Sequence, residues 1–195
     1  MIKIGFIGLG VMGAPMAGHL SNANYDIKVF NRSVSKTNNW LKNYKGISVK
    51  NPYEIAKESD LIFTCVGNDN DIIKIFYGEN GILKGLKKGA ICVDHSTASA
   101  NIAKKLSKDL KVYKSYFIDA PVSGGQVGAE KGILSIMCGG DKLIFDKVLP
   151  IMTSYGSKIS LIGGPGSGQL AKMVNQICIA GLVQALSEGI NFGIN

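Results

Sequence analysis

Strand-like and helix-like stretches alternate along most of this 195-residue chain, and this alternation constrains its fold more than any other feature. The strand-like runs are apolar on both faces, so they fit a parallel sheet that helices cover on each side. Gly-rich links late in the chain leave room for an antiparallel far edge. The runs that we expect to form strands are 2–8, 26–32, 61–66, 90–96, 115–121, 133–140 and 158–163.

The first of these runs is followed by a glycine-rich stretch made of Gly8, Leu9, Gly10, Val11, Met12 and Gly13. Glycines alone often only turn a chain, but a G-x-G-x-x-G between a buried strand and an amphipathic helix fits the dinucleotide fingerprint. Gly8 would allow a tight turn, Gly10 the approach of a pyrophosphate, and Gly13 close helix packing. The helix N-terminus would favour the anion. We therefore expect an α/β Rossmann-type doubly wound sheet with these six residues at a cofactor.

Asn31, Arg32 and Ser33 follow the second strand, where an NAD-preferring site usually carries Asp or Glu. This stretch has no carboxylate to repel a phosphate. Arg32 can form charge-assisted bonds to the 2′-phosphate of NADP, with Asn31 and Ser33 as further donors. The alternative is that Arg32 is a surface arginine in a loop. We expect NADP as the cofactor, with NAD as the open alternative.

Two more strands end at the same edge of the predicted sheet, where ligands of open α/β sheets bind. Val66 and Gly67 follow the third strand and could pack on the nicotinamide or its ribose. Thr97 follows the fourth strand and could bond the ribose or the carboxamide. We interpret His95 as a strand-end residue rather than an acid or base, because no placed partner for it is evident.

A strand over 115–121 breaks into Ser123, Gly124 and Gly125. Successive N–H groups in such a turn can cradle a carboxylate, although a plain β-turn fits the same residues. Lys172 and Asn175 are three residues apart in a long, mostly apolar helical segment and so share a face. A desolvated lysine there could donate to a substrate oxygen, but a lysine at a helix flank can also snorkel to solvent.

Five motifs in this order resemble the β-hydroxyacid dehydrogenase family, which includes 3-hydroxyisobutyrate dehydrogenases and small semialdehyde reductases. The resemblance covers essentially the whole chain. The motifs are GFIGLGVMGAPMAGHL, VFNRS, DHST, DAPVSGG followed by GAEKGILSIMCGG, and GSGQLAKMVNQ.

The resemblance implies roles for individual residues. Lys172 matches the family's catalytic lysine, and Asn175 matches the asparagine one helical turn further on. The loop of Ser123, Gly124 and Gly125 matches the family's substrate-carboxylate loop. The implied reaction is reversible hydride transfer between NADP(H) and a small 3-hydroxy acid or semialdehyde, with Lys172 as proton donor and acceptor.

The same resemblance makes Thr97, Val66 and Gly67 cofactor contacts. Many members carry proline where this chain has Gly67, so the contact there is expected to be looser. Asp71 stands where some members carry a cofactor-contacting asparagine. These departures affect only the region of the cofactor.

Two alternatives to this enzyme stay open. The first is a non-catalytic dinucleotide-binding module, which would have no use for Lys172, Asn175 or the Ser123 loop. The second is a related imine or phosphogluconate-type reductase. No extra phosphate-binding cluster lies near Ser123 in the sequence, which disfavours a sugar phosphate.

Family members continue through a long helix into a second, all-helical domain that usually completes the dimer. We therefore expect a cofactor-binding domain over 1–164 and the start of an interdomain helix over 165–195, with the helical domain missing. On this interpretation the chain is a truncated form. The longer form is expected to be a homo-oligomer that acts on a small carboxylic acid.

Composition argues against several other classes. The net charge is +8, but the lysines are spread between polar and apolar residues, which is typical of solvated helix faces rather than a nucleic-acid site. No apolar run was expected to reach the length of a membrane span, and the N-terminus has no signal-peptide pattern, so we expect a cytoplasmic protein. Four cysteines without a CxxC pair and two histidines predict reduced thiols and no metal site.

Overall fold

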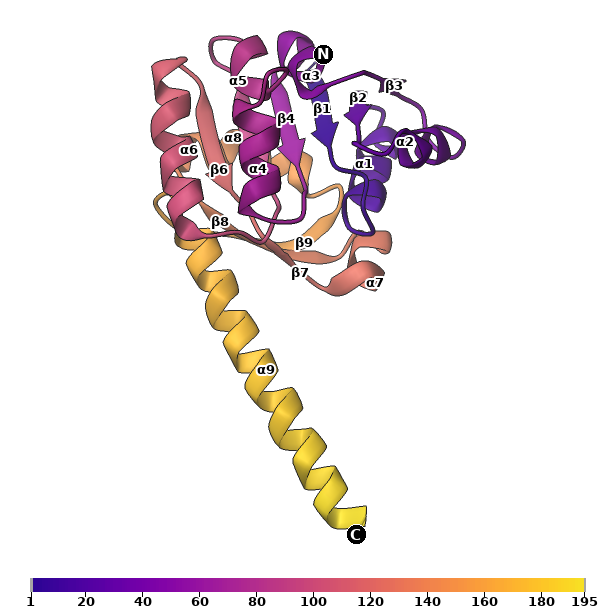
Figure 1. Ribbon diagram of the computed structural model, residues 1–195, viewed down its shortest axis with the longest axis vertical. Helices are drawn as coiled ribbons and strands as arrows, with labels where there is room; N and C mark the ends of the chain where they lie inside the picture. Colours follow the sequence, from indigo (N-terminus) through magenta and orange to yellow (C-terminus); the bar gives the residue numbers. More distant parts are fainter. Residues whose placement is uncertain (1, 195) are drawn as a thin grey trace.

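The computed structural model describes residues 2–194 and contains one sheet with helices on both of its faces (Figure 1). The strand order is β3-β2-β1-β4-β5-β6-β8-β7, and β9 pairs with β8. The strands are β1 Lys3–Ile7, β2 Asp26–Phe30, β3 Ile47–Ser48, β4 Leu61–Thr64, β5 Ile91–Asp94, β6 Tyr116–Asp119, β7 Val122–Ser123, β8 Leu134–Gly139 and β9 Gly156–Gly163. The helices are α1 Gly13–Asn22, α2 Val34–Leu41, α3 Pro52–Glu58, α4 Asp69–Tyr77, α5 Ile82–Gly85, α6 Ala100–Val112, α7 Gly125–Glu130, α8 Lys142–Met152 and α9 Ser167–Ile194.

The half of the sheet from β3 to β6 is parallel throughout. The chain winds outward from β1 to β3, returns, and continues on the other side with β4, so the strand order reverses between β1 and β4. A doubly wound sheet opens a crevice at the carboxyl ends of the strands where its order reverses. The predicted Rossmann-type sheet is confirmed, and its crevice lies beside the glycine-rich stretch.

The far edge of the sheet is mixed. β8 runs antiparallel to both β6 and β7, whereas β9 runs parallel to β8. The antiparallel edge left open by the sequence is therefore present. The sequence did not predict β3 and β7, because a strand of two residues is too short to show an apolar period.

Two apolar clusters, one on each face, hold the sheet in place. Phe6 and Phe63 point into the cluster under α1, α7 and α8, while Ile7 and Ile62 point into the cluster under α3 to α6. Neighbouring residues of a strand point to opposite faces, so both faces are buried. Full burial of such a side chain contributes about 1.5–3 kcal/mol, and these clusters fix the strand ends that carry the site.

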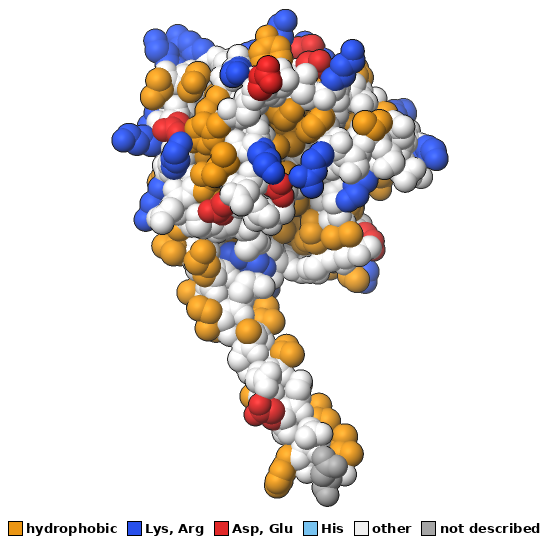
Figure 2. Space-filling view, viewed as in Figure 1, with side chains coloured by type: hydrophobic (Ala, Val, Ile, Leu, Met, Phe, Trp, Pro, Cys, Tyr) orange, Lys and Arg blue, Asp and Glu red, His pale blue; other side chains and the backbone are white. Residues whose placement is uncertain are grey.

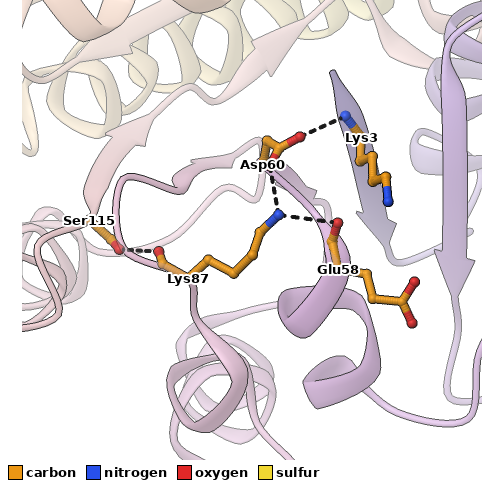
Figure 3. A network of polar contacts seen from close by, with 5 residues as sticks. All are labelled: Lys3, Glu58, Asp60, Lys87 and Ser115. Carbon is orange, nitrogen blue, oxygen red and sulfur yellow. Dashed lines mark hydrogen bonds and ion pairs between the residues drawn. The ribbon is translucent and has the colours of Figure 1, made fainter. Parts of the chain in front are cut away.

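A polar network ties together the opposite end of the sheet, away from the crevice (Figure 3). The Asp60 carboxylate accepts from the Lys3 backbone N–H at 3.0 Å and from the Lys87 ammonium at 2.6 Å. Ser115 donates to the Lys87 carbonyl at 2.9 Å. The Lys87 ammonium holds the pKa of Asp60 below its usual value. The network joins segments that begin β1, β4, β5 and β6.

The long helix α9 packs only its beginning on the sheet. Gly168, Gln169 and Lys172 are buried, whereas apolar side chains further along project into solvent (Figure 2). The expectation that no segment reaches membrane-span length was wrong: within residues 2–194, α9 alone is long and apolar enough by length and composition. The prediction rests on an unbroken apolar run, whereas a span needs only a high mean hydropathy, which isolated polar residues such as Gln184 and Glu188 do not remove.

Candidate functional site

A cleft of about 670 Å³ opens where β1, β2 and β4 end. All of the residues predicted to bind the cofactor line it except Leu9 and Thr97. These lining residues are Gly8, Gly10, Val11, Met12, Gly13, Asn31, Arg32, Ser33, Val66, Gly67 and Asp71. The sequence analysis did not single out further lining residues, which are Ile7, Phe30, Lys36, Pro52, Cys65, Lys74, Ile75, Gly78, Glu79 and Asn80.

The three glycines of the first loop differ in what surrounds them. Gly8 has a φ of +101°, and a Cβ there would lie 2.1 Å from the Cys65 carbonyl oxygen. A Cβ at Gly13 would lie 1.9 Å from the Gly8 carbonyl oxygen. A Cβ at Gly10, in contrast, would meet nothing within 4 Å. The fold itself therefore explains Gly8 and Gly13, while Gly10 keeps one side of the cleft open.

The first turn of α1 faces this open space. Within residues 2–194, no side chain caps the helix, and Met12 occupies the N-cap position. The N-terminal N–H groups of a helix and its dipole attract anions. Lys36 and Lys74 also line the cleft and add positive charge. The cleft thus offers an anion site beside a glycine that leaves room for it.

The backbone N–H of Leu9 and the side chain of Asn31 fasten the glycine loop to the end of β2. The Leu9 side chain is buried in the core, and its backbone N–H donates to Asn31 Oδ1 at 2.9 Å. Asn31 Nδ2 donates to the Ser33 carbonyl at 3.1 Å. Leu9 lies outside the lining of the cleft, whereas Asn31 lines it, and the contacts of both residues with a cofactor stay predictions.

Arg32 extends from the end of β2 with its side chain 82% exposed. Its Nη1 lies 3.3 Å from Oδ1 of Asp71, which comes from the first turn of α4. The sequence analysis found no acid at the end of β2, and the fold brings one there from 39 residues further along the chain. A guanidinium and a carboxylate thus share this end of the cleft.

His95 lies in the core rather than in the cleft. Its Nδ1 lies 2.7 Å from the Ala120 carbonyl and its Nε2 lies 2.8 Å from the Tyr155 hydroxyl. A carbonyl only accepts, so Nδ1 carries the proton and Nε2 accepts from Tyr155. The ring stacks on Phe63 at 5.6 Å, and burial lowers the pKa of His95 to about 4. These contacts support the interpretation of His95 as a neutral strand-end residue.

Asp94, which the sequence analysis did not single out, ties the ends of β4 and β5 together. Its Oδ1 accepts from Thr64 Oγ1 at 2.7 Å and from Ser96 Oγ at 2.6 Å. The Ser96 hydroxyl oxygen in turn accepts from the Val66 N–H at 2.9 Å. Burial raises the pKa of Asp94 to about 6. The network fixes Val66 at the wall of the cleft.

The loop that carries Thr97 is held by α9. Gln169 accepts from the Ala98 N–H at 3.0 Å and donates to the Ser96 carbonyl at 2.7 Å. Thr97 lies between these two anchors and is exposed, outside the lining of the cleft. Its contact with a cofactor therefore stays a prediction.

Asp119 anchors the start of α9. This buried carboxylate accepts from the Gly166 N–H at 2.7 Å and from the Gln169 N–H at 3.0 Å. Burial raises the pKa of Asp119. The only sign of this role in the sequence is an acid at the end of an apolar strand. Together Asp119 and Gln169 fix the direction in which α9 leaves the sheet.

Lys172 lies one turn beyond these anchors and is only 8% exposed. Burial lowers the pKa of its ammonium, which has no hydrogen-bonding or ionic partner within residues 2–194. Asn175 is half-buried, and its Nδ2 donates to Gln176 Oε1 at 3.0 Å. Neither residue lines the cleft.

Ser123 ends β7 and pairs with Ser135 of β8. Gly124 and Gly125 follow with φ values of +134° and +63°, and both are exposed. α9 packs against β8, so the helix of Lys172 and the strand of Ser123 both adjoin this strand. The structure thus places the two predicted substrate elements on the mixed edge of the sheet, outside the lining of the cleft.

Comparison with known proteins agrees with this geometry. Residues 3–163 match the family model described as the NAD binding domain of 6-phosphogluconate dehydrogenase. The 2-hydroxy-3-oxopropionate reductase of Escherichia coli is 38% identical over 191 residues, which cover 98% of this chain and 65% of the reductase. The chain belongs to the β-hydroxyacid dehydrogenase family.

Other members of the family resemble the chain over similar lengths. An uncharacterized oxidoreductase of Shewanella frigidimarina is 50% identical over 192 residues, covering 98% of this chain and 66% of the relative. The chain therefore spans slightly less than two thirds of the curated relatives that it matches.

Two solved structures share the fold. A Mycobacterium tuberculosis 3-hydroxyisobutyrate dehydrogenase with L-serine has a TM-score of 0.89 at 26% identity, and the match covers 100% of this chain and 67% of that one. Psf3, solved with NADP+ and 2-OPP, has a TM-score of 0.88 at 26% identity, with 97% and 68% covered. Psf3 thus binds NADP+ on a scaffold that this chain shares.

Proposed function

We propose that this chain is the cofactor-binding part of an oxidoreductase that interconverts a small 3-hydroxy acid and its semialdehyde, with NADP(H) preferred. The observation that carries the proposal is Gly10, whose missing side chain nothing in the fold requires. A glycine that keeps open space beside an uncapped helix N-terminus fits a pyrophosphate. Family membership supports the same class of ligand.

The residues present fit a nicotinamide dinucleotide along the whole cleft. Gly10 and the first turn of α1 would hold the pyrophosphate, Arg32 the 2′-phosphate, and Val66 the nicotinamide end, while Gly67 would line the cleft beside Asp71. When bound, the nicotinamide supplies or accepts the hydride. The Asp94 network fixes Val66, so this wall of the cleft is set before a ligand arrives.

Lys172 would act on the substrate oxygen. Its side chain is largely desolvated, and its lowered pKa makes the ammonium a better proton donor than an exposed lysine. The ammonium can donate a hydrogen bond to the carbonyl oxygen and supply a proton as negative charge develops there. In the opposite direction the neutral amine can accept that proton.

Ser123, Gly124 and Gly125 would hold the substrate carboxylate. Gly124 and Gly125 both have positive φ values, so the strand ends before them, and both residues are exposed to solvent. Successive N–H groups in such a conformation form an anion-binding concavity. The loop would orient the acid so that its carbonyl faces both the cofactor and Lys172.

The test is a titration of NADPH and NADH into the chain, followed by nicotinamide fluorescence, with Arg32→Ala beside it. We expect NADPH to bind more tightly than NADH. Arg32→Ala should lower the affinity for NADPH about tenfold, because a charge-assisted hydrogen bond to the 2′-phosphate is lost. The affinity for NADH should stay almost unchanged. Failure of both cofactors to bind would overturn the proposal, and equal affinity for both would overturn the preference for NADP(H).

A further inference from the structure

Two residues of opposite charge meet at the ribose end of the cleft. Arg32 follows β2, and Asp71 belongs to the first turn of α4. Arg32 Nη1 lies 3.3 Å from Asp71 Oδ1, and both residues line the cleft. We propose that Asp71 is a selectivity residue that serves the 2′-hydroxyl of NAD and competes with the 2′-phosphate of NADP for Arg32. This inference rests on the proposed function.

The Asp71 carboxylate is the better fixed member of the pair. Its side chain is 25% exposed, against 82% for Arg32. Asn68 caps α4 by accepting from the Asp71 backbone N–H at 3.1 Å, which fixes the turn that carries the carboxylate. Arg32 is therefore the member of the pair that can change partners when a ligand enters.

Gly67 makes room for this carboxylate. A Cβ at Gly67 would lie 2.7 Å from Asp71 Oδ2, so a larger residue there would push the carboxylate away. The φ of Gly67 lies outside the left-handed region, so the backbone does not require glycine at this position. The absence of a side chain is explained by the space that Asp71 occupies.

The two cofactors place opposite demands on this pair. In an NAD site a carboxylate accepts a hydrogen bond from the 2′-hydroxyl, and an acid for this purpose is missing at the end of β2. Asp71 brings a carboxylate to the same end of the cleft from another element. A 2′-phosphate is attracted by Arg32 but repelled by the carboxylate beside it, because like charges a few ångströms apart interact strongly outside bulk water. Asp71 therefore narrows the preference for NADP that Arg32 creates.

The test is a titration of NADPH and of NADH into the unmodified chain and into Asp71→Asn, which removes the charge and keeps the shape. We expect the affinity for NADPH to rise about three- to tenfold and the affinity for NADH to fall about three- to tenfold. Raising the salt concentration should reduce the NADPH change. A ratio of affinities that does not move, or moves toward NADH, would overturn the inference.

Two further variants serve as a second test and as a matched control. Gly67→Ala should displace the Asp71 carboxylate and move the ratio in the same direction as Asp71→Asn, by a smaller factor. Asp146→Asn removes the same charge from α8, where Asp146 pairs with Lys142 away from the cleft, and should leave both affinities unchanged. If the unmodified chain binds neither cofactor, the proposed function falls together with this inference. If it binds both and Asp71→Asn leaves the ratio as it was, only the inference falls.

Discussion

The cofactor cleft and the helix of Lys172 are built in different ways. The cleft is lined mainly by the segments at the ends of β1, β2 and β4, and its glycine loop is fastened by Asn31. α9 is fastened at its first turn by Asp119 and Gln169, and beyond Lys172 it exposes apolar side chains to solvent (Figure 2). Cofactor binding is therefore expected to depend on the domain alone, whereas the predicted chemistry depends on a helix that the domain only begins to cover.

Replacing Lys172 should have the greatest effect of all the variants, and it should lower turnover without changing cofactor affinity. Lys172→Ala should lower the rate of NADPH oxidation with small semialdehyde acids by about 10²–10⁴-fold, because general acid catalysis at the substrate oxygen is lost. The affinity for NADPH should change less than about twofold, since Lys172 lies outside the cleft. The measurements are turnover and fluorescence titration on the same preparation.

Lys142→Ala is the matched control for this experiment. It removes the ammonium group of an exposed side chain at the start of α8, where Lys142 pairs with Asp146. This variant should change neither turnover nor the affinity for NADPH. Unchanged turnover in Lys172→Ala, or no turnover in either form, would contradict the assignment of Lys172.

The next prediction concerns the pH dependence of stability, which depends on Asp94 at the end of β5 and on the adjacent His95. The pKa of Asp94 is raised from 3.8 to about 6, so the folded state binds the extra proton and stability falls as pH rises from 4 to 6. The pKa of His95 is lowered from 6.5 to about 4, so the folded state binds fewer protons and stability rises over the same range. The two slopes oppose each other.

Replacing either residue should therefore leave the pH dependence of the unfolding free energy to the other one. Relative to the unmodified chain, Asp94→Asn should make the free energy of unfolding rise more steeply between pH 4 and 6, by up to about 3 kcal/mol. His95→Gln should change the slope in the opposite direction by a similar amount. Denaturant unfolding at several pH values measures both, and variants whose slopes match the unmodified chain would refute the account.

A smaller effect tests the anchor of α9. Asp119→Ala should destabilise the chain by about 1–3 kcal/mol, because the buried N–H groups of Gly166 and Gln169 lose their acceptor. The cleft should still bind NADPH once the protein is folded. Amide hydrogen exchange should speed up in the first turn of α9 and stay the same in α1; equal changes in both helices would show that the two regions are not separable.

The parts of the fold that follow from local patterns could be predicted from the sequence. Each apolar strand, and the spacing of Gly8, Gly10 and Gly13, lies within one short stretch of sequence. The parallel sheet and the place of the cleft could therefore be predicted from them. The interpretation of His95 also followed, because no partner was evident near it in the sequence. The partners of its ring, the Ala120 carbonyl and the Tyr155 hydroxyl, are 25 and 60 residues away.

What could not be predicted depends on contacts between distant segments. Asp71 reaches Arg32 across 39 residues, and Asp119 reaches Gln169 across 50. A buried acid that bonds to backbone N–H groups has no sequence pattern of its own, because its partners are amides that every residue carries. The hydrogen bond between the Leu9 N–H and Asn31 could not be predicted for a similar reason, because it becomes visible only when β1 and β2 lie side by side.

On the proposed function, position 10 carries glycine because a ligand needs the space that a side chain would fill. NADPH is titrated calorimetrically into the unmodified chain, Gly10→Ala and Gly13→Ala, with a thermal melt of each. The account predicts that Gly10→Ala melts like the unmodified chain and loses at least about tenfold in NADPH affinity, because its methyl group fills open space at the anion site. Gly13→Ala should melt lower, since its Cβ would meet the Gly8 carbonyl oxygen. Gly10→Ala that binds NADPH as tightly as the unmodified chain would contradict the claim.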